Sequence, residues 1–147
     1  MTGRPGPAAG SARRFRVGAA AARPCTVVVC RGCCCGNPRK YPGIDHDWQL
    51  DLLRAAAAES DGRVAVRVSD CLGPCDQANV IVVQPSTAGR QAGGKPTWIG
   101  FAMGDDCTEE LIAWVTAGGP GLAPPPATLE LQFVATPREA KAARGRR

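Results

Sequence analysis

The segment TVVVCRGCCCG, at residues 26–36, is the most informative stretch of this 147-residue chain. Thr26 to Cys30 are β-branched or apolar without interruption, which predicts a strand buried on both faces of a sheet. Cys30 is the last residue of that strand, and three more cysteines follow at 33–35. Thiol groups therefore leave the end of a central strand.

The stretch from about Asp45 to Glu59 is predicted to form an amphipathic helix. Its apolar side chains recur at a spacing of four residues: Ile44, Trp48, Leu52 and Ala56. We expect Trp48 to lie in the core as part of this stripe, and His46 to be a residue at the helix end. The pair Asp61-Gly62 stops the helix.

The rest of the sequence continues to alternate between strand and helix patterns. Strands are predicted at 64–68, 80–83 and 97–101, with a Gly-rich loop at 86–96 and a last short strand at 128–134. Asp106 and Glu109 resemble a capping box, which predicts a final helix with Leu111, Ile112 and Val115 on its buried face. The order β-α-β-β-β-α predicts an α/β sandwich of the thioredoxin-like type.

A second cysteine segment, Cys71-Leu72-Gly73-Pro74-Cys75, follows the strand at 64–68. Residues 26–69 form a β-α-β unit, and the two strands of such a unit run parallel and end at the same edge of the sheet. We therefore expect both cysteine loops to meet in space. That convergence is what a site of four thiolate ligands requires.

Four thiolates select zinc or an iron–sulfur cluster. Zinc sites usually pair two C-x-x-C motifs, and the spacing between Cys71 and Cys75 suits such a motif poorly. A [2Fe–2S] cluster tolerates unequal gaps. Gly32, Gly36 and Gly73 also allow backbone N–H groups to approach the sulfur atoms closely. The spacing favours the cluster.

These residues resemble the thioredoxin-like [2Fe–2S] ferredoxins and are similar to the small [2Fe–2S] subunit of bacterial NADH:quinone oxidoreductase. The resemblance covers roughly residues 25–117 and depends mainly on the two cysteine loops and on Trp98-Ile99-Gly100. It implies one-electron transfer to a redox partner protein, often by a homodimer. The ligands it implies for the [2Fe–2S] cluster are Cys30, Cys35, Cys71 and Cys75.

The chain departs from that family at two places. Three consecutive cysteines stand where the family usually has one, so Cys34 or Cys33 is an alternative to Cys35 as a ligand. Ala78-Asn79 stands where the family tends to have Gly-Pro, a change that touches no ligand.

Two other functions stay open beside the electron carrier. Cys30-Arg31-Gly32-Cys33 has the C-x-x-C form of a thiol–disulfide oxidoreductase, although that function leaves Cys71 and Cys75 without a role. A zinc-binding structural or regulatory module would use the same thiolates. Cys25 and Cys107 are expected to be ordinary packing thiols. No nucleotide-binding motif or convincing catalytic triad is visible, so we expect a carrier and not an enzyme.

Charge divides the chain into three parts. Residues 1–23 carry five Arg and no acid, and residues 136–147 carry five basic residues against one acid, a net +4. Residues 24–135 carry 8 basic and 12 acidic residues, a net −4. We expect a single domain at 24–135 between two disordered basic tails. Beyond Phe15 no aromatic residue accompanies the tail arginines, so nucleic acid is not an expected partner.

The predicted location is cytoplasmic. No apolar run approaches the length of a membrane helix, and no segment has the pattern of a secretory signal. The chain has 8 cysteines, and disulfides seldom persist in a reducing compartment. The cysteines therefore point to metal binding or redox chemistry.

Overall fold

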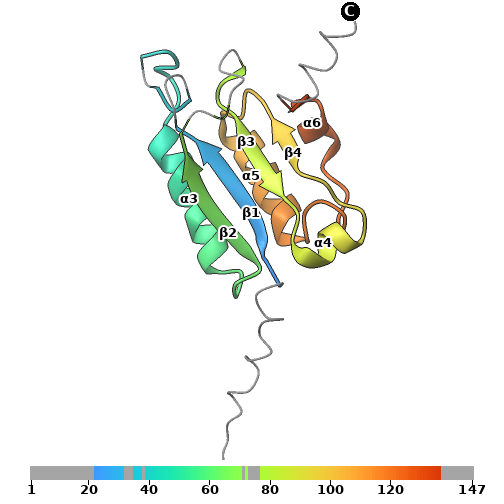
Figure 1. The fold of residues 1–147 in the computed structure, drawn as a ribbon. Helices are drawn as coiled ribbons and strands as arrows, with labels where there is room; N and C mark the ends of the chain where they lie inside the picture. The colour runs from blue at the N-terminus through green and yellow to red at the C-terminus, as the bar shows by residue number, and fades with distance from the viewer. Residues whose placement is uncertain (1–21, 32–34, 38, 71, 73–76, 137–147) are drawn as a thin grey trace, which may run out of the picture.

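The computed structural model describes residues 22–31, 35–37, 39–70, 72 and 77–136. The predicted basic tails lie outside the described residues, except for Ala22, Arg23 and Thr136. The helices and strands follow one another in the order β1 (Cys25–Cys30), α3 (His46–Ala58), β2 (Val64–Ser69), β3 (Ile81–Gln84), α4 (Thr87–Gln91), β4 (Thr97–Ile99), α5 (Asp105–Thr116), α6 (Ala127–Glu130) and β5 (Phe133–Val134) (Figure 1). The predicted mixed α/β class is confirmed.

The strands form one open mixed sheet in the order β2-β1-β3-β4-β5. β1 and β2 run parallel, with Cys25 opposite Val64 and Cys30 opposite Ser69. All other neighbouring strands are antiparallel. The predicted parallel β-α-β unit is thus confirmed, and β1 and β2 end together at one edge. We call this edge the cysteine edge.

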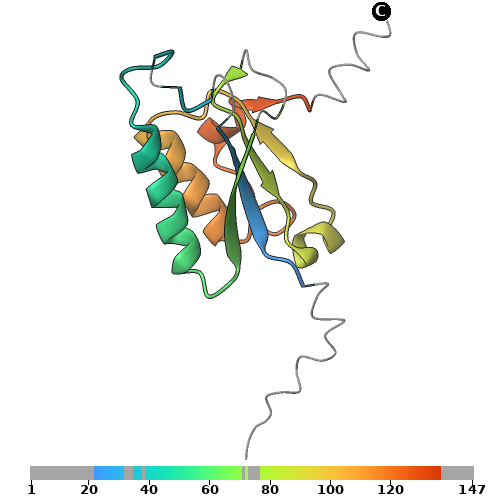
Figure 2. The same cartoon turned by 60° about the vertical axis from the view of Figure 1, so that its left-hand side comes forward.

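The helices α3 and α5 both cover the same face of the sheet (Figure 2). Val27 and Val29 of β1 point toward them and join the main core, which also contains Leu53 and Leu111. Side chains of β-strands alternate between the two faces, so Thr26, Val28 and Cys30 point away from these helices. We call that side the open face. None of the helices in the described ranges has the length and apolarity needed to cross a bilayer.

The buried side of α3 differs from the predicted stripe. His46, Gln49 and Leu53 are buried, whereas Trp48 is 40% exposed. The prediction that Trp48 belongs to the core is therefore wrong. Gln49 and the Nδ1 atom of His46 have hydrogen-bond partners inside the protein. Such partners reduce the cost of burying polar groups on this side of the helix.

Three other predictions need correction. Gly104, and not Asp106, is the N-cap of α5, and it makes no side-chain capping bond. The predicted loop at 86–96 contains the short helix α4, which begins where the Ser86 hydroxyl accepts a hydrogen bond from the Gly89 N–H. The predicted strand at 128–134 is α6 followed by the short strand β5. All three corrections concern a helix end or an element of only a few residues, and hydrophobic periodicity does not identify such short features.

Candidate metal centre

Cys30 lies at the cysteine edge, where the first loop leaves the sheet. It is the last residue of β1 and is buried. Its thiol donates a weak hydrogen bond to the carbonyl of Asp70, with a distance of 3.6 Å between sulfur and oxygen. The next residue, Arg31, donates its N–H to the Ser69 carbonyl at 2.9 Å. The start of the first cysteine loop is therefore fastened to the end of β2.

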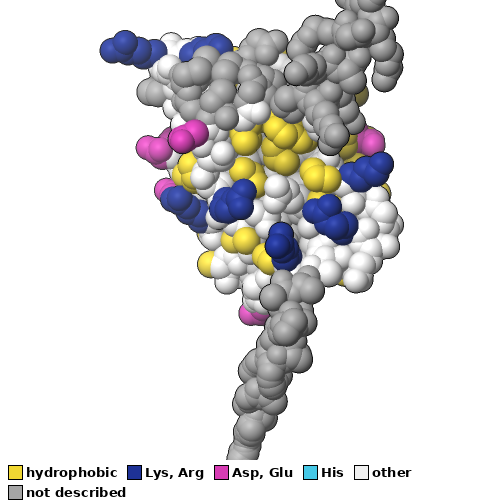
Figure 3. Space-filling view, in the orientation of Figure 1, with side chains coloured by type: hydrophobic (Ala, Val, Ile, Leu, Met, Phe, Trp, Pro, Cys, Tyr) yellow, Lys and Arg dark blue, Asp and Glu magenta, His cyan; other side chains and the backbone are white. Residues whose placement is uncertain are grey.

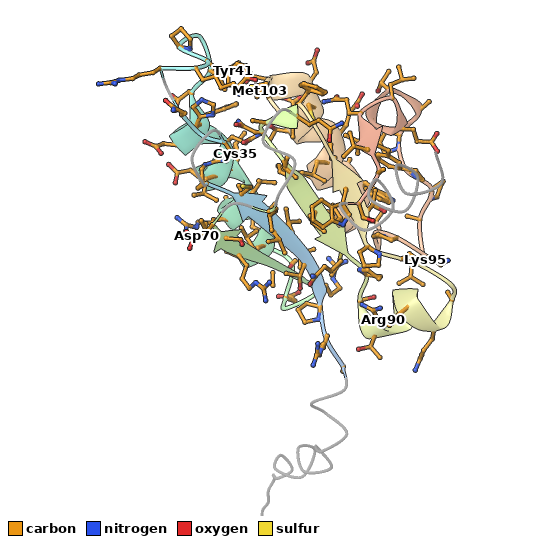
Figure 4. The ribbon with its side chains drawn as sticks, turned by 45° about the horizontal axis from the view of Figure 1, so that its top comes forward. Cys35, Tyr41, Asp70, Arg90, Lys95 and Met103 are labelled. Atoms are coloured by element: carbon orange, nitrogen blue, oxygen red, sulfur yellow. The ribbon has the colours of Figure 1, made fainter. Side chains whose placement is uncertain are left out.

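Cys35 is also buried, and it packs with Cys30. The N–H of Val80, just before β3, donates to its sulfur at 3.3 Å. Figure 4 shows Cys35 at the cysteine edge, at the opposite end of the molecule from Arg90 and Lys95. The two cysteines share an apolar cluster on the open face with Val28, Ala78, Val80 and Val82, flanked by Tyr41, Leu72 and Trp98.

The position of the second cysteine loop is indicated by the described residues before and after it. Cys71 and Cys75 lie outside the described residues, as do Cys33 and Cys34. Asp70 and Leu72 stand on either side of Cys71 in the sequence. The carbonyl oxygen of Asp70 accepts the hydrogen bond from the Cys30 thiol, and Leu72 packs against the cluster. Ala78, three residues after Cys75, is buried in the same cluster. Both loops thus leave from one place.

The surroundings of Cys35 favour the neutral thiol over the thiolate. Burial raises its pKa to about 12, although the hydrogen bond from Val80 acts in the opposite direction. The nearby Cys30 raises this pKa further, and the Arg31 guanidinium lowers it. A metal ligand must be a thiolate. Cys35 would therefore have to lose its proton on binding a metal ion.

Arg31 is a positive charge that interacts electrostatically with Cys30 and Cys35. Its guanidinium donates to the carbonyl oxygens of Cys30 and His46, at 2.9 and 3.1 Å, and to the Gln49 amide oxygen at 3.2 Å. Burial lowers its pKa, while Cys35 and Cys30 raise it. Arg31 thus joins the cysteine loop to α3 and can balance negative charge on the thiolates.

Asn79 fixes the other side of the loop and is fully buried. Its Oδ1 accepts the N–H of Gly36 at 2.7 Å, which identifies the other terminal atom as the donor Nδ2. That Nδ2 lies 3.0 Å from Nδ1 of His46, so Nδ1 must accept and neutral His46 carries its proton on Nε2.

His46 is the first residue of α3, as predicted, but it is buried. Burial lowers its pKa, and the charge of Arg31 lowers it further. Its Nε2 has no hydrogen-bond partner within the described part of the chain. On the same side of α3, Gln49 donates to the Ala102 carbonyl at 2.9 Å and to the Thr108 hydroxyl at 3.2 Å.

Sequence reasoning missed Asn79 and Gln49. The available signal for Gln49 was its position three residues after His46, which places two polar side chains on one side of a helix. No local signal marks Asn79, because its partners are 43 and 33 residues away in the sequence.

Cys25 and Cys107 are buried in the main core, on the helix-covered face of the sheet. They are thus packing thiols, as predicted. Burial raises the pKa of Cys107 and raises the pKa of Cys25 to about 11.

The thiol of Cys25 should make the metal-free protein less stable at alkaline pH. The ordinary pKa of a cysteine thiol in the unfolded chain is 9.0, whereas burial raises the pKa of folded Cys25 to about 11. Ionisation therefore favours the unfolded state as the pH rises between these values. We expect the free energy of unfolding to fall by about 2 kcal/mol at about pH 11 from Cys25 alone. Urea unfolding of the reduced protein between about pH 8 and pH 11 measures this loss.

The Cys25→Ala variant is the matched comparison, because it removes the ionisable group and leaves Cys35 and Cys107 in place. Its stability should fall less steeply with pH than that of the wild type, by about 2 kcal/mol over the same range. An equally steep fall in both proteins would contradict the assignment.

No group of three or more His, Cys, Asp or Glu side chains within the described ranges is placed to hold a metal ion. Two of the four predicted ligands, Cys71 and Cys75, lie outside those ranges. No protein-family model, curated protein or solved structure matches this chain.

Proposed function

We propose that this chain is a one-electron carrier that binds one [2Fe–2S] cluster through Cys30, Cys35, Cys71 and Cys75. One observation carries the proposal: two of these thiols are buried side by side at the cysteine edge, in one cluster with Leu72, one residue after Cys71, and Ala78, three residues after Cys75. Parallel strands β1 and β2 bring both loops to that edge.

The chemistry of the described donors fits a thiolate-bound cluster. The Val80 N–H already points to the Cys35 sulfur, and hydrogen bonds to sulfur are among the features that set a cluster's potential. Arg31 supplies a compensating positive charge from within the loop's own hydrogen-bond network. The bound cluster would supply the ability to accept and release one electron. The protein's part is to hold four thiolates and limit their contact with water.

As the finer description of the fold, we propose the thioredoxin-like type. The strand order β2-β1-β3-β4, with one parallel pair followed by antiparallel strands, supports it. The helices α3 and α5, packed on one face, support it as well. In this description α4, α6 and β5 are additions to the β-α-β-β-β-α core.

Anaerobic purification followed by absorption spectroscopy and metal analysis tests the proposal. We expect visible bands that bleach with dithionite and about two irons per chain, because a [2Fe–2S] cluster contains two irons and absorbs in the visible range. A colourless protein with about one zinc per chain would indicate the zinc-binding module instead. A colourless, metal-free protein with disulfide reductase activity would indicate the thiol–disulfide oxidoreductase.

The thiol–disulfide alternative has less support. A redox C-x-x-C motif gains reactivity when a helix N-terminus lowers the pKa of its thiol. The first helix after Cys30 in the described ranges, α3, begins only at His46. The described groups that favour a thiolate at Cys35 are the Val80 N–H and the Arg31 guanidinium, and not the N-terminus of a helix.

A further inference from the structure

A groove of about 690 Å³ lies on the open face, away from the cysteine edge. Its floor includes Thr26 of β1, Ala65 of β2 and Gln84 of β3, and strand pairing places these three residues side by side. Thr26 and Cys30 point to the same face, four residues apart, which corresponds to about 13 Å along the strand. The groove and the cysteine cluster thus share one face of the sheet.

Three arginines line this groove from three different segments. Arg23 precedes β1, Arg67 belongs to β2 and Arg90 belongs to α4. All three are exposed. Among the residues of the structure that are described, no carboxylate pairs with their guanidinium groups, and none lines the groove. Figure 3, which views the open face, shows Lys and Arg side chains around an apolar centre.

The opposite face has the opposite charge. Three acidic residues lie in or beside the first half of α3, at Asp45, Asp47 and Asp51. Four more lie in α5, at Asp105, Asp106, Glu109 and Glu110. Because these helices cover the far face of the sheet, the domain is acidic on one side and has a concentrated basic groove on the other.

We propose that this groove docks an acidic segment of a partner protein. Three arginines from separate segments line one concave site, and none of them pairs with a carboxylate of the described residues. Each guanidinium can form a paired hydrogen bond with a carboxylate. The groove has the volume of a ligand site and accommodates only a short segment. Charge complementarity of this kind sets partner choice and association rate.

A nucleic acid fits this surface less well. None of the residues that line the groove is aromatic, so it lacks a platform for base stacking. A nucleic-acid strand also continues its negative charge at every nucleotide, and beyond the edge strand β2 it would meet the acidic side of the domain. The proposal goes beyond the electron-carrier function and does not depend on it, since the groove contains none of the candidate ligands.

Fluorescence anisotropy with a labelled peptide of eight glutamates, on the full chain at about 0.1 M salt, tests the proposal. The Arg67→Glu/Arg90→Glu variant should bind this peptide about tenfold more weakly than the wild type, because two favourable charge contacts become repulsive. The matched control is Arg39→Glu/Arg54→Glu, which changes the net charge by the same amount at two exposed arginines that do not line the groove. The control should bind within about twofold of the wild type, since distant exposed charges are screened.

Three outcomes would overturn the proposal. They are equal weakening in both double variants, no measurable peptide binding by the wild type, and a larger loss for an eight-nucleotide thymidine strand than for the peptide. The last outcome would assign the groove to nucleic acid. Circular dichroism confirms that each variant folds, and Arg67→Gln/Arg90→Gln replaces the charge reversal if it does not. Metal content is measured separately, so a failure of this proposal is distinguishable from a failure of the cluster proposal.

Discussion

Replacing Cys35 by Ser should remove most of the visible absorption and bring the iron content from about two to well below one per chain. The reason is the position of the side chain: Cys35 is buried against Cys30, and its sulfur accepts the Val80 N–H. A serine hydroxyl is a poor replacement for a thiolate as an iron ligand. Absorption spectra and iron analysis of the anaerobically purified variant measure the loss.

The neighbouring cysteines provide matched controls for this substitution. Cys33→Ser and Cys34→Ser should retain more of the spectrum than Cys35→Ser, because we assign the second ligand position to Cys35. Cys25→Ser and Cys107→Ser should leave the iron content unchanged, since both residues lie in the main core on the other face of the sheet. If the loss is greatest for Cys33 or Cys34, that residue is the ligand and Cys35 is a packing thiol.

The strands were predictable because each one is marked by a sequence pattern within its own few residues. An uninterrupted run of β-branched or apolar residues marks β1, and alternation of Val with Ala, Arg and Ser marks β2. The buried side of α3 was not predictable in the same way. Hydrophobic periodicity assigns polar residues to the surface, yet His46 and Gln49 are buried here and Trp48 is exposed. Their burial depends on partners supplied by distant segments.

The meeting of the ends of β1 and β2 at the cysteine edge was predictable from a single topological rule. A right-handed β-α-β unit places the ends of its two strands at one edge, and the pairing of Cys30 with Ser69 bears this out. The hydrogen bonds of Asn79 with Gly36 and His46 could not be predicted from such a rule. Asn79 was visible in the sequence only as a departure from a family pattern, because its contacts with Gly36 and His46 exist only in the folded chain.

Replacing Asn79 by Ala should lower the free energy of unfolding by about 3 to 5 kcal/mol. The amide of Asn79 satisfies both the Gly36 N–H and the His46 Nδ1, and each partner left unsatisfied in a buried site costs about 1 to 3 kcal/mol. The truncated side chain adds a small cavity. Urea unfolding of the metal-free protein, followed by tryptophan fluorescence, to which the buried Trp114 contributes, measures the change.

A double-mutant cycle separates the amide's hydrogen bonds from the loss of its volume. His46→Phe removes the ring nitrogen that Asn79 contacts, so the Asn79→Ala substitution should cost about 1 kcal/mol less in that background. Gln91→Ala, at an exposed amide at the end of α4, should change stability by less than about 0.5 kcal/mol. If Asn79→Ala costs the same with or without His46, the two side chains are not coupled. The position of the first cysteine loop would then depend on Arg31 and on its backbone bonds to β2, and not on a link through Asn79 to the start of α3.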